Sequence, residues 1–325
     1  MKAAVLELLK KNPESYVSGS EISRTLDISR TAVWKHIRAL REEGYRIESR
    51  SRRGYRLRGV PDLLIPEEVR AGLTTRFCGR TYYHYPLLAS TNDRAKELAW
   101  QGAPEGTTVL AEEQSGGRGR LGRSWHSPRG GLWFSVVLRP ALPPVRAPEA
   151  TFVAAVAGTD VLRTCLETDE IGIKWPNDFV WRGKKLGGIL TELSGELDRI
   201  NHLVVGIGLN VNLDPGAFPA PLSGTVTSVQ EIRGRPVSRA NYLRRILTAL
   251  ERWYLVWLAD GFAPVLAAWK RYNACLDRNL RVSTPEGELA GRAVDVDRDG
   301  ALLLDLGGEI RRIVTGELFM EGDVG

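Results

Sequence analysis

The sequence of 325 residues has little of what disulfide-stabilised or metal-scaffolded proteins are built from. Its three cysteines, Cys78, Cys165 and Cys275, lie far apart, and its four histidines are scattered. This pattern contains neither a disulfide framework nor the ligand spacing of a zinc site. We therefore expect no metal held by the protein alone, and we assign no function to the cysteines.

Long apolar runs are also missing. No stretch approaches the roughly 20 apolar residues that a membrane helix needs. Lysines interrupt the apolar positions of the first 15 residues, and no small-residue cleavage site follows, unlike in a secretory signal. We expect a cytoplasmic protein with no membrane partner. Its 43% hydrophobic and 26% charged residues are typical of globular proteins.

Positive charge is concentrated at the N-terminus. The first 60 residues contain 14 lysines and arginines against 7 aspartates and glutamates, a net charge of +7, whereas the other 265 residues have a net charge of −1. This distribution is typical of a small nucleic-acid-binding module joined to a neutral body. The length predicts two or three domains.

The basic segment has the pattern of a winged helix-turn-helix. A first helix is expected before Asn12-Pro13. Ser18 is an expected N-cap for a second, short helix over 21–26, and a third helix is expected over 30–43, ending at Gly44. An alternating hairpin over 45–57 has an arginine-rich turn, which predicts a wing. A solvated helical bundle with surface arginines is the alternative. The residues expected to contact double-stranded DNA are Ser29, Arg30, Thr31, Trp34, Lys35, Arg50, Arg52 and Arg53.

The body of the chain follows a linker marked by Val60-Pro61 and Ile65-Pro66 and contains short strands and a few helices. Strands are expected over 81–85, 107–111, 132–138, 171–175, 179–181, 186–193 and 203–211, and helices over 94–100, 148–167, 239–260 and 264–272. This order predicts an α+β protein whose antiparallel or mixed sheet is covered by helices on one side. After Asn273, short strands with glycine-rich turns predict a small β-barrel.

A glycine- and arginine-rich loop follows the strand at 107–111. Gly117, Gly119 and Gly122 satisfy the G-x-G-x-x-G spacing of dinucleotide-binding folds. That interpretation requires a helix to begin inside the motif, and residues 124–131 are unsuited to one. We favour a mobile loop whose arginines grip phosphate, namely Arg118, Arg120 and Arg123.

Five ordered motifs closely resemble those of the biotin protein ligases. They are Ser90-Thr91-Asn92, residues 117–123, Lys174-Trp175-Pro176-Asn177-Asp178, residues 185–190 and Gly206-Ile207-Gly208-Leu209-Asn210. With the N-terminal winged helix, the resemblance is to the bifunctional members, which also repress the biotin biosynthetic operon, and it covers essentially the whole chain. It implies a class II synthetase-like catalytic domain with an SH3-like C-terminal barrel, and domains over 1–60, 61–272 and 273–325.

The resemblance implies a reaction in two steps. The carboxylate of biotin attacks the α-phosphate of ATP, with Mg²⁺ on the ATP phosphates, and forms biotinyl-5′-AMP and pyrophosphate. A lysine of the biotin carboxyl carrier protein of acetyl-CoA carboxylase then takes the biotinyl group. It also implies a homodimer promoted by biotinyl-AMP, which acts as corepressor and lets two winged helices grip a palindromic operator.

The resemblance assigns residues to this chemistry. Lys185 and Arg118 are expected to be catalytic. Residues expected to bind biotin are Ser90, Thr91, Asn92, Gln114, Arg118, Gly119, Arg120 and Lys185. Residues expected to bind ATP or the adenylate are Arg118, Arg120, Arg123, Lys174, Asp178 and Asn210. No protein ligand for a metal is assigned.

Structural roles remain open for these residues. Ser90 can cap a helix, Asp178 can pair with Lys174, and Asn210 can satisfy a turn. Two other functions also remain open, a biotin sensor without catalysis and a ligase for lipoate or a similar acid. The arginine-rich loop and Lys185 argue against the sensor, which needs no phosphate clamp.

Overall fold

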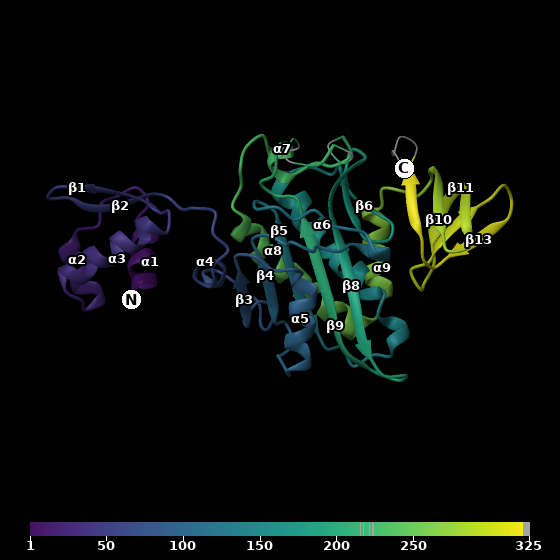
Figure 1. The fold of residues 1–325 in the computed structure, drawn as a ribbon, viewed down its shortest axis with the longest axis horizontal. Helices are drawn as coiled ribbons and strands as arrows, with labels where there is room; N and C mark the ends of the chain where they lie inside the picture. Colours follow the sequence, from purple (N-terminus) through teal and green to yellow (C-terminus); the bar gives the residue numbers. More distant parts are fainter. Residues whose placement is uncertain (215, 217, 221, 223, 321–325) are drawn as a thin grey trace. The chain divides into compact units, whose positions relative to one another are not determined.

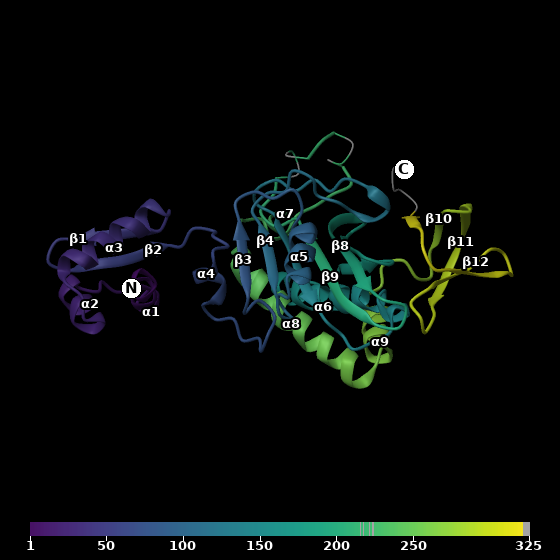
Figure 2. The same cartoon turned by 60° about the horizontal axis from the view of Figure 1, so that its bottom comes forward.

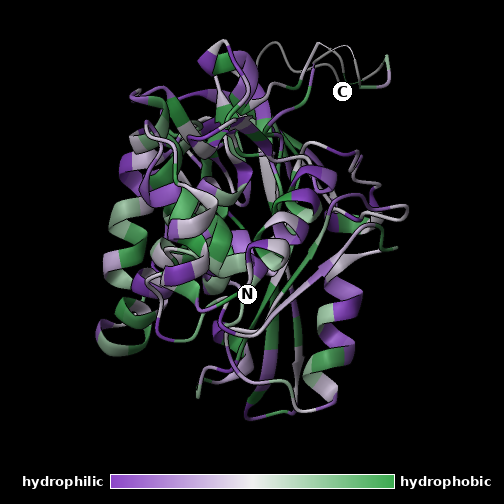
Figure 3. Ribbon diagram, turned by 90° about the vertical axis from the view of Figure 1, so that its left-hand side faces the viewer, coloured by the Kyte–Doolittle hydropathy of each residue, from purple (hydrophilic) through white to green (hydrophobic). Residues whose placement is uncertain are grey.

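A computed structural model describes residues 1–320 except 215, 217, 221 and 223. The chain divides into two compact units, Met1–Leu63 and Leu64–Gly325 (Figure 1). Figure 3 shows hydrophobic and hydrophilic residues alternating along the helices, as expected for helices with one buried face.

The first unit contains three helices and a two-stranded hairpin. Its elements are α1 (Lys2–Lys11), α2 (Gly19–Leu26), α3 (Arg30–Glu42), β1 (Arg46–Arg50) and β2 (Gly54–Gly59). Ser18 caps α2, and Ser29 caps α3 by accepting a hydrogen bond from the amide of Ala32 at 3.1 Å. Val33, Ile37 and Leu40 are buried on one face of α3, so its other face is left to solvent.

The second unit is built on a mixed sheet. Among the described residues, seven strands lie in the order β3-β4-β5-β9-β8-β7-β6, and only the β3–β4 pair is parallel. The strands are β3 (Tyr82–Tyr85), β4 (Thr108–Ala111), β5 (Leu132–Leu138), β6 (Ile171–Lys174), β7 (Asp178–Trp181), β8 (Lys184–Gly195) and β9 (Ile200–Leu209).

Helices cover both faces of this sheet (Figure 2). The helices are α4 (Pro66–Arg70), α5 (Thr91–Trp100), α6 (Glu149–Leu166), α7 (Val229–Arg233), α8 (Arg239–Asp260) and α9 (Ala263–Tyr272). Val109 of β4 packs with α5, and its neighbour Leu110 lies in the larger core with α6 and α8. The expectation of helices on one side only is wrong, because α5 buries Ala95 and Leu98 against the second face.

Two short elements correct the expected linker and loops. Pro66 is the first residue of α4. At this position a backbone N–H would have no partner within the helix, so proline is well tolerated, and the segment after Ile65 is not simply linker. The loop after β4 contains only the 3-10 turn η1 (Arg120–Gly122) and no helix begins within the G-x-G-x-x-G spacing. The dinucleotide-binding interpretation is thereby excluded.

The C-terminal part forms an antiparallel sheet of five strands among the described residues. Its order is β13-β12-β11-β10-β14, and the strands are β10 (Asn279–Thr284), β11 (Gly287–Val296), β12 (Leu302–Asp305), β13 (Ile310–Ile313) and β14 (Glu317–Met320). The indole N–H of Trp175 donates to the carbonyl of Gly300 at 3.0 Å, and Lys270 pairs with Asp295 at 2.6 Å. These contacts connect this sheet to the central one.

Candidate active site

One cavity of about 480 Å³ brings together every residue that the sequence assigns to catalysis, biotin or ATP. It lies over the central sheet and is also bordered by β14. The assigned residues that line it are Ser90, Thr91, Asn92, Gln114, Arg118, Gly119, Arg120, Arg123, Lys174, Asp178, Lys185 and Asn210. Their proximity is an observation, and their individual roles stay predictions.

Polar groups at the start of α5 form one end of the cavity. The hydroxyl of Ser90 caps α5 by accepting from the amide of Asp93 at 3.4 Å. The amide and hydroxyl of Thr91 both donate to Oε1 of Gln114, at 2.8 and 3.1 Å, and Nε2 of Gln114 donates to Ser127 at 2.9 Å. Ser90 therefore caps a helix and lines the cavity at the same time.

The side-chain amide of Asn92 is held by protein groups on both sides. Its Oδ1 accepts from the hydroxyl of Ser135 at 2.6 Å, and its Nδ2 donates to Oε2 of Glu192 at 2.7 Å. Ser135 is fully buried on β5, and its Oγ also lies 2.7 Å from Oγ1 of Thr91. Sequence reasoning missed Ser135 and Glu192, which orient the residues that it assigned to biotin.

Glycines of β8 and β9 form the floor. A Cβ on Gly206 would collide with Oδ1 of Asn92, and a Cβ on Gly208 would lie 2.7 Å from the indole nitrogen of Trp125. The paired position Gly188 faces the same indole. Side chains are therefore excluded from this part of the floor, and the indole N–H of Trp125 is buried without an acceptor among the described residues.

A lysine lies directly above this floor. Nζ of Lys185 is 2.6 Å from Oδ2 of Asp178 and 5.1 Å from the ring centroid of Trp125. The other oxygen of Asp178 is buried with no hydrogen-bond donor among the described residues. Asp178 therefore forms its ion pair with Lys185, and not with Lys174 as the alternative from the sequence had it.

Arg118 is held by carboxylates outside the loop. Its guanidinium lies 2.5 Å from Asp93 and 3.7 Å from Glu192, and Lys96 contacts the same two carboxylates at 3.0 and 2.8 Å. Burial raises the pKa of Asp93, but the hydrogen bonds from Arg118 and Lys96 outweigh it and leave the pKa below its usual value. Asp93 thus stays ionised and fixes the loop arginine to α5.

The other two loop arginines point to different partners. Arg120 donates to Oδ1 of Asn177 at 3.1 Å, and burial lowers the pKa of Arg120. Arg123 forms an ion pair with Glu317 of β14. Glu317 and its neighbour Phe319 line the cavity, so the C-terminal sheet contributes residues that sequence reasoning did not assign.

Asn210 and Lys174 lie at strand ends beside the cavity. Asn210 is buried, and its Nδ2 donates to the carbonyl of Thr227 at 3.0 Å, so it satisfies a turn as well as lining the cavity. Lys174 is the last residue of β6, next to the loop that carries Asn177.

The residues assigned to DNA lie in the first unit and are all exposed. Ser29, Arg30, Thr31, Trp34 and Lys35 lie at or near the start of α3, and Trp34 is 52% exposed. Arg50, Arg52 and Arg53 lie at the hairpin turn, where Arg52 has a positive φ of 64°. Arg50 pairs with Glu48 at 2.9 Å. All the residues expected to contact DNA therefore lie either at one exposed face of α3 or at the tip of one hairpin.

Close relatives of this sequence combine ligase and repressor. It is 40% identical to the bifunctional ligase/repressor BirA of Bacillus subtilis (strain 168), and the match of 321 residues covers 98% of each chain. It is 32% identical to the bifunctional ligase/repressor BirA of Escherichia coli (strain K12), and the match of 309 residues covers 93% of this chain and 92% of the relative. The chain belongs to the biotin protein ligase family.

Family models match each part of this biotin protein ligase. The biotin/lipoate A/B protein ligase family matches residues 85–210, an HTH domain matches 2–56, and the biotin protein ligase C terminal domain matches 276–320. The biotin protein ligase from Aquifex aeolicus in complex with biotin and ATP superposes with a TM-score of 0.64 at 28% identity, covering 74% of this chain and 98% of that one. The predicted fold class is confirmed.

Two features are absent from the described part of this biotin protein ligase. None of its helices is long and apolar enough to cross a membrane. Within the same residues, no group of three or more histidines, cysteines, aspartates or glutamates is placed to hold a metal ion. Carboxylates of the cavity are instead paired with lysine or arginine.

Proposed function

We propose that this chain is an ATP-dependent biotin protein ligase that also represses biotin biosynthesis genes. The observation that carries the ligase function is the single cavity that joins a hydrogen-bonding end, a floor of glycines and a cluster of cations. Its relatives with 40% and 32% identity are bifunctional ligase/repressors. The substrates are biotin and ATP, and the first product is biotinyl-5′-AMP.

In the first step an oxygen of the biotin carboxylate attacks the α-phosphorus of ATP. The bond from the α-phosphorus to the bridging oxygen breaks, and pyrophosphate leaves with that electron pair. Because two anions must meet, cations at the reacting atoms lower the barrier most. Lys185 is the cation at this place, and Arg118 moves from Asp93 to the ligand as the loop closes.

Biotin lies with its ring system at the polar end of the cavity. Thr91 and Gln114 already share a hydrogen bond there, so their remaining donors and acceptors are fixed in direction. Ser90 contributes its hydroxyl. The side-chain amide of Asn92 is occupied by Ser135 and Glu192, so Asn92 shapes the wall. The indole N–H of Trp125 is the unsatisfied donor nearest the floor.

The nucleotide lies toward Lys174, Asp178 and Asn210. Mg²⁺ prefers oxygen ligands and often uses one or two carboxylates together with substrate phosphates. The unpartnered oxygen of Asp178 fits such a ligand. Bound Mg²⁺ would neutralise charge on the ATP phosphates. Arg120 and Arg123 lie within reach of phosphate, and Gly119 gives the loop the freedom to close.

Closure of the loop over the adenylate excludes water, which would otherwise hydrolyse the mixed anhydride. In the second step, the neutral amine of a lysine on the biotin carboxyl carrier protein of acetyl-CoA carboxylase attacks the acyl carbon. The bond from the acyl carbon to the AMP oxygen breaks, AMP leaves, and the amine loses a proton as the amide forms. Glu317 and Phe319 of β14 border the cavity from which the acyl group leaves.

The repressor function belongs to the first unit. The exposed face of α3 enters the major groove and the arginines of the hairpin turn contact phosphate. Biotinyl-AMP promotes a homodimer, and two winged helices then bind a palindromic operator. This requires the adenylate to bind the dimer more tightly than the monomer. Equal dimerisation with and without biotin and ATP would contradict it.

The remaining assignments complete the proposal. The DNA-binding, catalytic and C-terminal domains cover 1–60, 61–272 and 273–325, and the protein acts in the cytoplasm. A non-catalytic sensor is disfavoured because Lys185, Arg118 and Arg120 all lie on one cavity. A lipoate-type ligase is disfavoured because two relatives of this chain, at 40% and 32% identity, are named bifunctional ligase/repressors, and the similar Aquifex aeolicus structure is a biotin protein ligase in complex with biotin and ATP.

The deciding experiment is biotin-dependent exchange of labelled pyrophosphate into ATP, with purified full chain and Mg²⁺. Lipoate is the control acid. Exchange with biotin alone supports the proposed adenylation and its substrate. Exchange with lipoate alone supports the lipoate-type ligase, and no exchange from folded protein supports the sensor.

A further inference from the structure

A second cavity, of about 390 Å³, lies between the C-terminal end of α6 and the N-terminal end of α8. It shares no lining residue with the candidate active site. Nothing in the proposed ligase or repressor chemistry uses it.

Three arginines line this cavity. Arg233 is the last residue of α7, Arg235 lies in the following loop, and Arg245 lies on α8. Among the lining residues, Glu167 carries the one carboxylate, which is 76% exposed and lies 3.8 Å from Arg233. The cavity is therefore lined by more positive than negative charge, which favours an anionic ligand.

Neutral donors and the helix add to this potential. Ser238 and Asn241 also line the cavity, and Ser238 is the N-cap of α8. The N-terminal end of a helix of 22 residues carries a partial positive charge. The N-terminal end of α8 thus favours the same sign of ligand as the arginines, which must outweigh the opposite partial charge at the C-terminal end of α6.

The wall of the cavity is fixed in place. The amide and carbonyl of Val237 both bind the side chain of Asn212, at 2.9 and 2.8 Å. Arg239, the first residue of α8, is buried and donates to Glu112 at 2.7 Å and to the carbonyl of Gly131 at 3.0 Å. A ligand therefore meets a loop that is already ordered, which lowers the entropic cost of binding.

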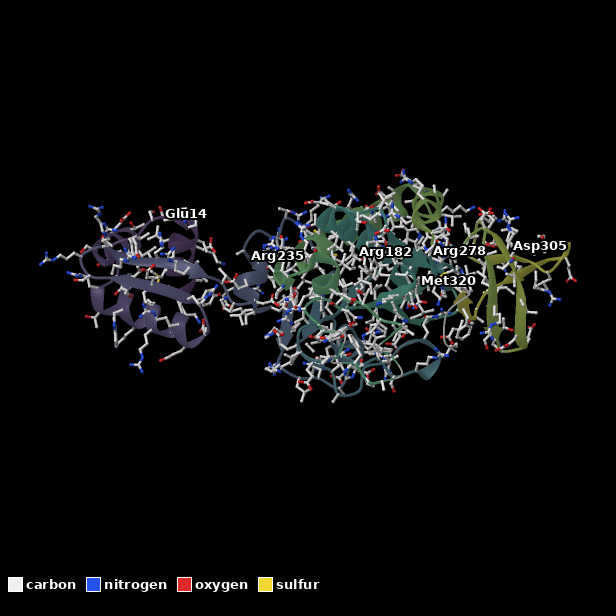
Figure 4. All side chains as sticks on the ribbon, turned by 90° about the horizontal axis from the view of Figure 1, so that it is seen from above. Glu14, Arg182, Arg235, Arg278, Asp305 and Met320 are labelled. Carbon is white, nitrogen blue, oxygen red and sulfur yellow. The ribbon has the colours of Figure 1, made fainter. Side chains whose placement is uncertain are left out.

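We propose that this cavity binds a phosphoryl group through Arg233, Arg235 and Arg245. Guanidinium groups pair with phosphate oxygens in a planar, two-point geometry, and three of them match a dianion with several oxygens better than a single carboxylate. The phosphoryl group comes either from inorganic phosphate or from a phosphorylated metabolite. Arg235 is labelled in Figure 4 and is exposed, so the group enters from solvent.

Cys165 provides a local reporter of occupancy. It lines this cavity and is partly exposed, whereas Cys78 and Cys275 are 0% exposed. The experiment measures the rate at which N-ethylmaleimide alkylates the full chain, followed by intact mass. Cys165→Ser should abolish the fast alkylation and so confirm the reporter. The added anions are inorganic phosphate, glucose 6-phosphate and, at matched ionic strength, chloride.

Bound phosphate should slow alkylation about fivefold at a concentration near four times its Kd. Arg235→Ser and Arg245→Ser should each remove most of this protection, and Arg298→Ser, which changes an arginine outside the cavity, should retain it. Thermal unfolding without phosphate checks that the variants are folded. If Arg245→Ser does not fold, the loss of protection in Arg235→Ser alone tests the proposal. Protection by only one of the two phosphorylated ligands identifies the source.

Three results would overturn the proposal. Chloride could protect as well as phosphate, which would mean simple screening. Protection could survive both arginine substitutions, or no anion could protect. In the last case the arginines only stabilise the C-terminal end of α6.

Discussion

Lys185 and Asp178 form an ion pair in the cavity, with Nζ 2.6 Å from Oδ2, and the second oxygen of Asp178 has no donor among the described residues. The pair holds the ammonium group over the indole of Trp125. Lys185 is thus held in the cavity without being buried, since its side chain is 38% exposed. Lys185 therefore places a positive charge in the cavity while contributing little to the stability of the fold.

Lys185→Ala should therefore reduce activity far more than stability, although Asp178 loses its ion-pair partner. We expect the rate of biotin-dependent pyrophosphate exchange to fall about 100-fold or more, which is typical of losing one group that stabilises transition-state charge. Lys184→Ala is the matched control, because Lys184 is the adjacent lysine and pairs with Glu231 at 3.7 Å instead. Unchanged exchange by Lys185→Ala would remove this residue from the mechanism.

Glu192 should act as a positioning residue for the biotin end. It accepts from Nδ2 of Asn92 at 2.7 Å and pairs with Lys96 at 2.8 Å. Glu192→Ala should raise the KM for biotin about tenfold, the equivalent of about 1.4 kcal/mol, with little change in kcat. Glu192→Gln keeps an acceptor for Asn92 and should restore most of the affinity. Glu196→Ala, on an exposed residue that pairs with Arg199, is the control.

Ser135→Ala should destabilise the protein and weaken biotin binding together. The buried hydroxyl serves both Thr91 and Asn92. Its loss leaves the buried Oδ1 of Asn92 without this donor, which costs about 1–3 kcal/mol, whereas the hydroxyl of Thr91 keeps its hydrogen bond to Gln114. Urea unfolding monitored by tryptophan fluorescence measures this cost, with Ser194→Ala on β8 as the comparison. Equal midpoints for the two variants would argue against the buried network.

Glu112 should make stability depend on pH in the acidic range. Burial raises its pKa, but hydrogen bonds with His84, at 3.0 Å, and Arg239, at 2.7 Å, outweigh this and leave the pKa below its usual value. A carboxylate with a lowered folded pKa stabilises the native state above its unfolded pKa of about 4.3, and this contribution is lost as the pH falls below that value.

Glu112→Gln should therefore lower the free energy of unfolding at pH 7 by about 3 kcal/mol, because Arg239 loses its buried partner. It should also flatten the decline in stability between pH 5 and pH 3. Glu113→Gln changes the neighbouring residue, which is only half-buried and pairs with Arg129 at 3.5 Å, and should do neither. A decline of the same steepness in Glu112→Gln would place the responsible carboxylate elsewhere.

The wing arginines should determine the salt dependence of DNA binding. Arg52 and Arg53 lie exposed at the hairpin turn. If each contacts a phosphate, the double variant Arg52→Ser/Arg53→Ser should lower the slope of log K against log salt by about two. Fluorescence anisotropy with a labelled duplex measures the slope, and Arg298→Ser controls for net charge. An unchanged slope would mean that the hairpin does not contact the DNA.

Caps and periodicity made much of the fold predictable. Ser18, Ser29 and Ser90 each cap a helix where the sequence places one, and the helix expected over 239–260 has those bounds in the structure. Local signals suffice for such elements because the residues that begin and end a helix act within one turn.

The parts that could not be predicted depend on contacts between distant segments. Ser135 is one polar residue in an otherwise apolar, fully buried strand, so its sequence indicates core packing. Glu192 and Asp93 are far apart in the chain, and only the packing of α5 across β4, β5 and β9 brings them to Arg118 and Lys96. Glu317 lines the cavity because the C-terminal sheet folds onto it, which no local pattern indicates.

The glycines at 188, 206 and 208 have a consequence for the folding equilibrium. They leave a strip of the central sheet without side chains, in the middle of a core that is otherwise filled. Glycine favours the unfolded chain and offers nothing to pack against, so this strip is intrinsically weak as a β-sheet. The atoms that pack on this strip come from Asn92 of α5 and the indole of Trp125, and a bound ligand that holds the loop at Trp125 in place secures this packing. Ligand binding to the cavity and the local stability of this part of the sheet are then linked. The backbone amides of this strip should therefore exchange with solvent more slowly in the ligand complex.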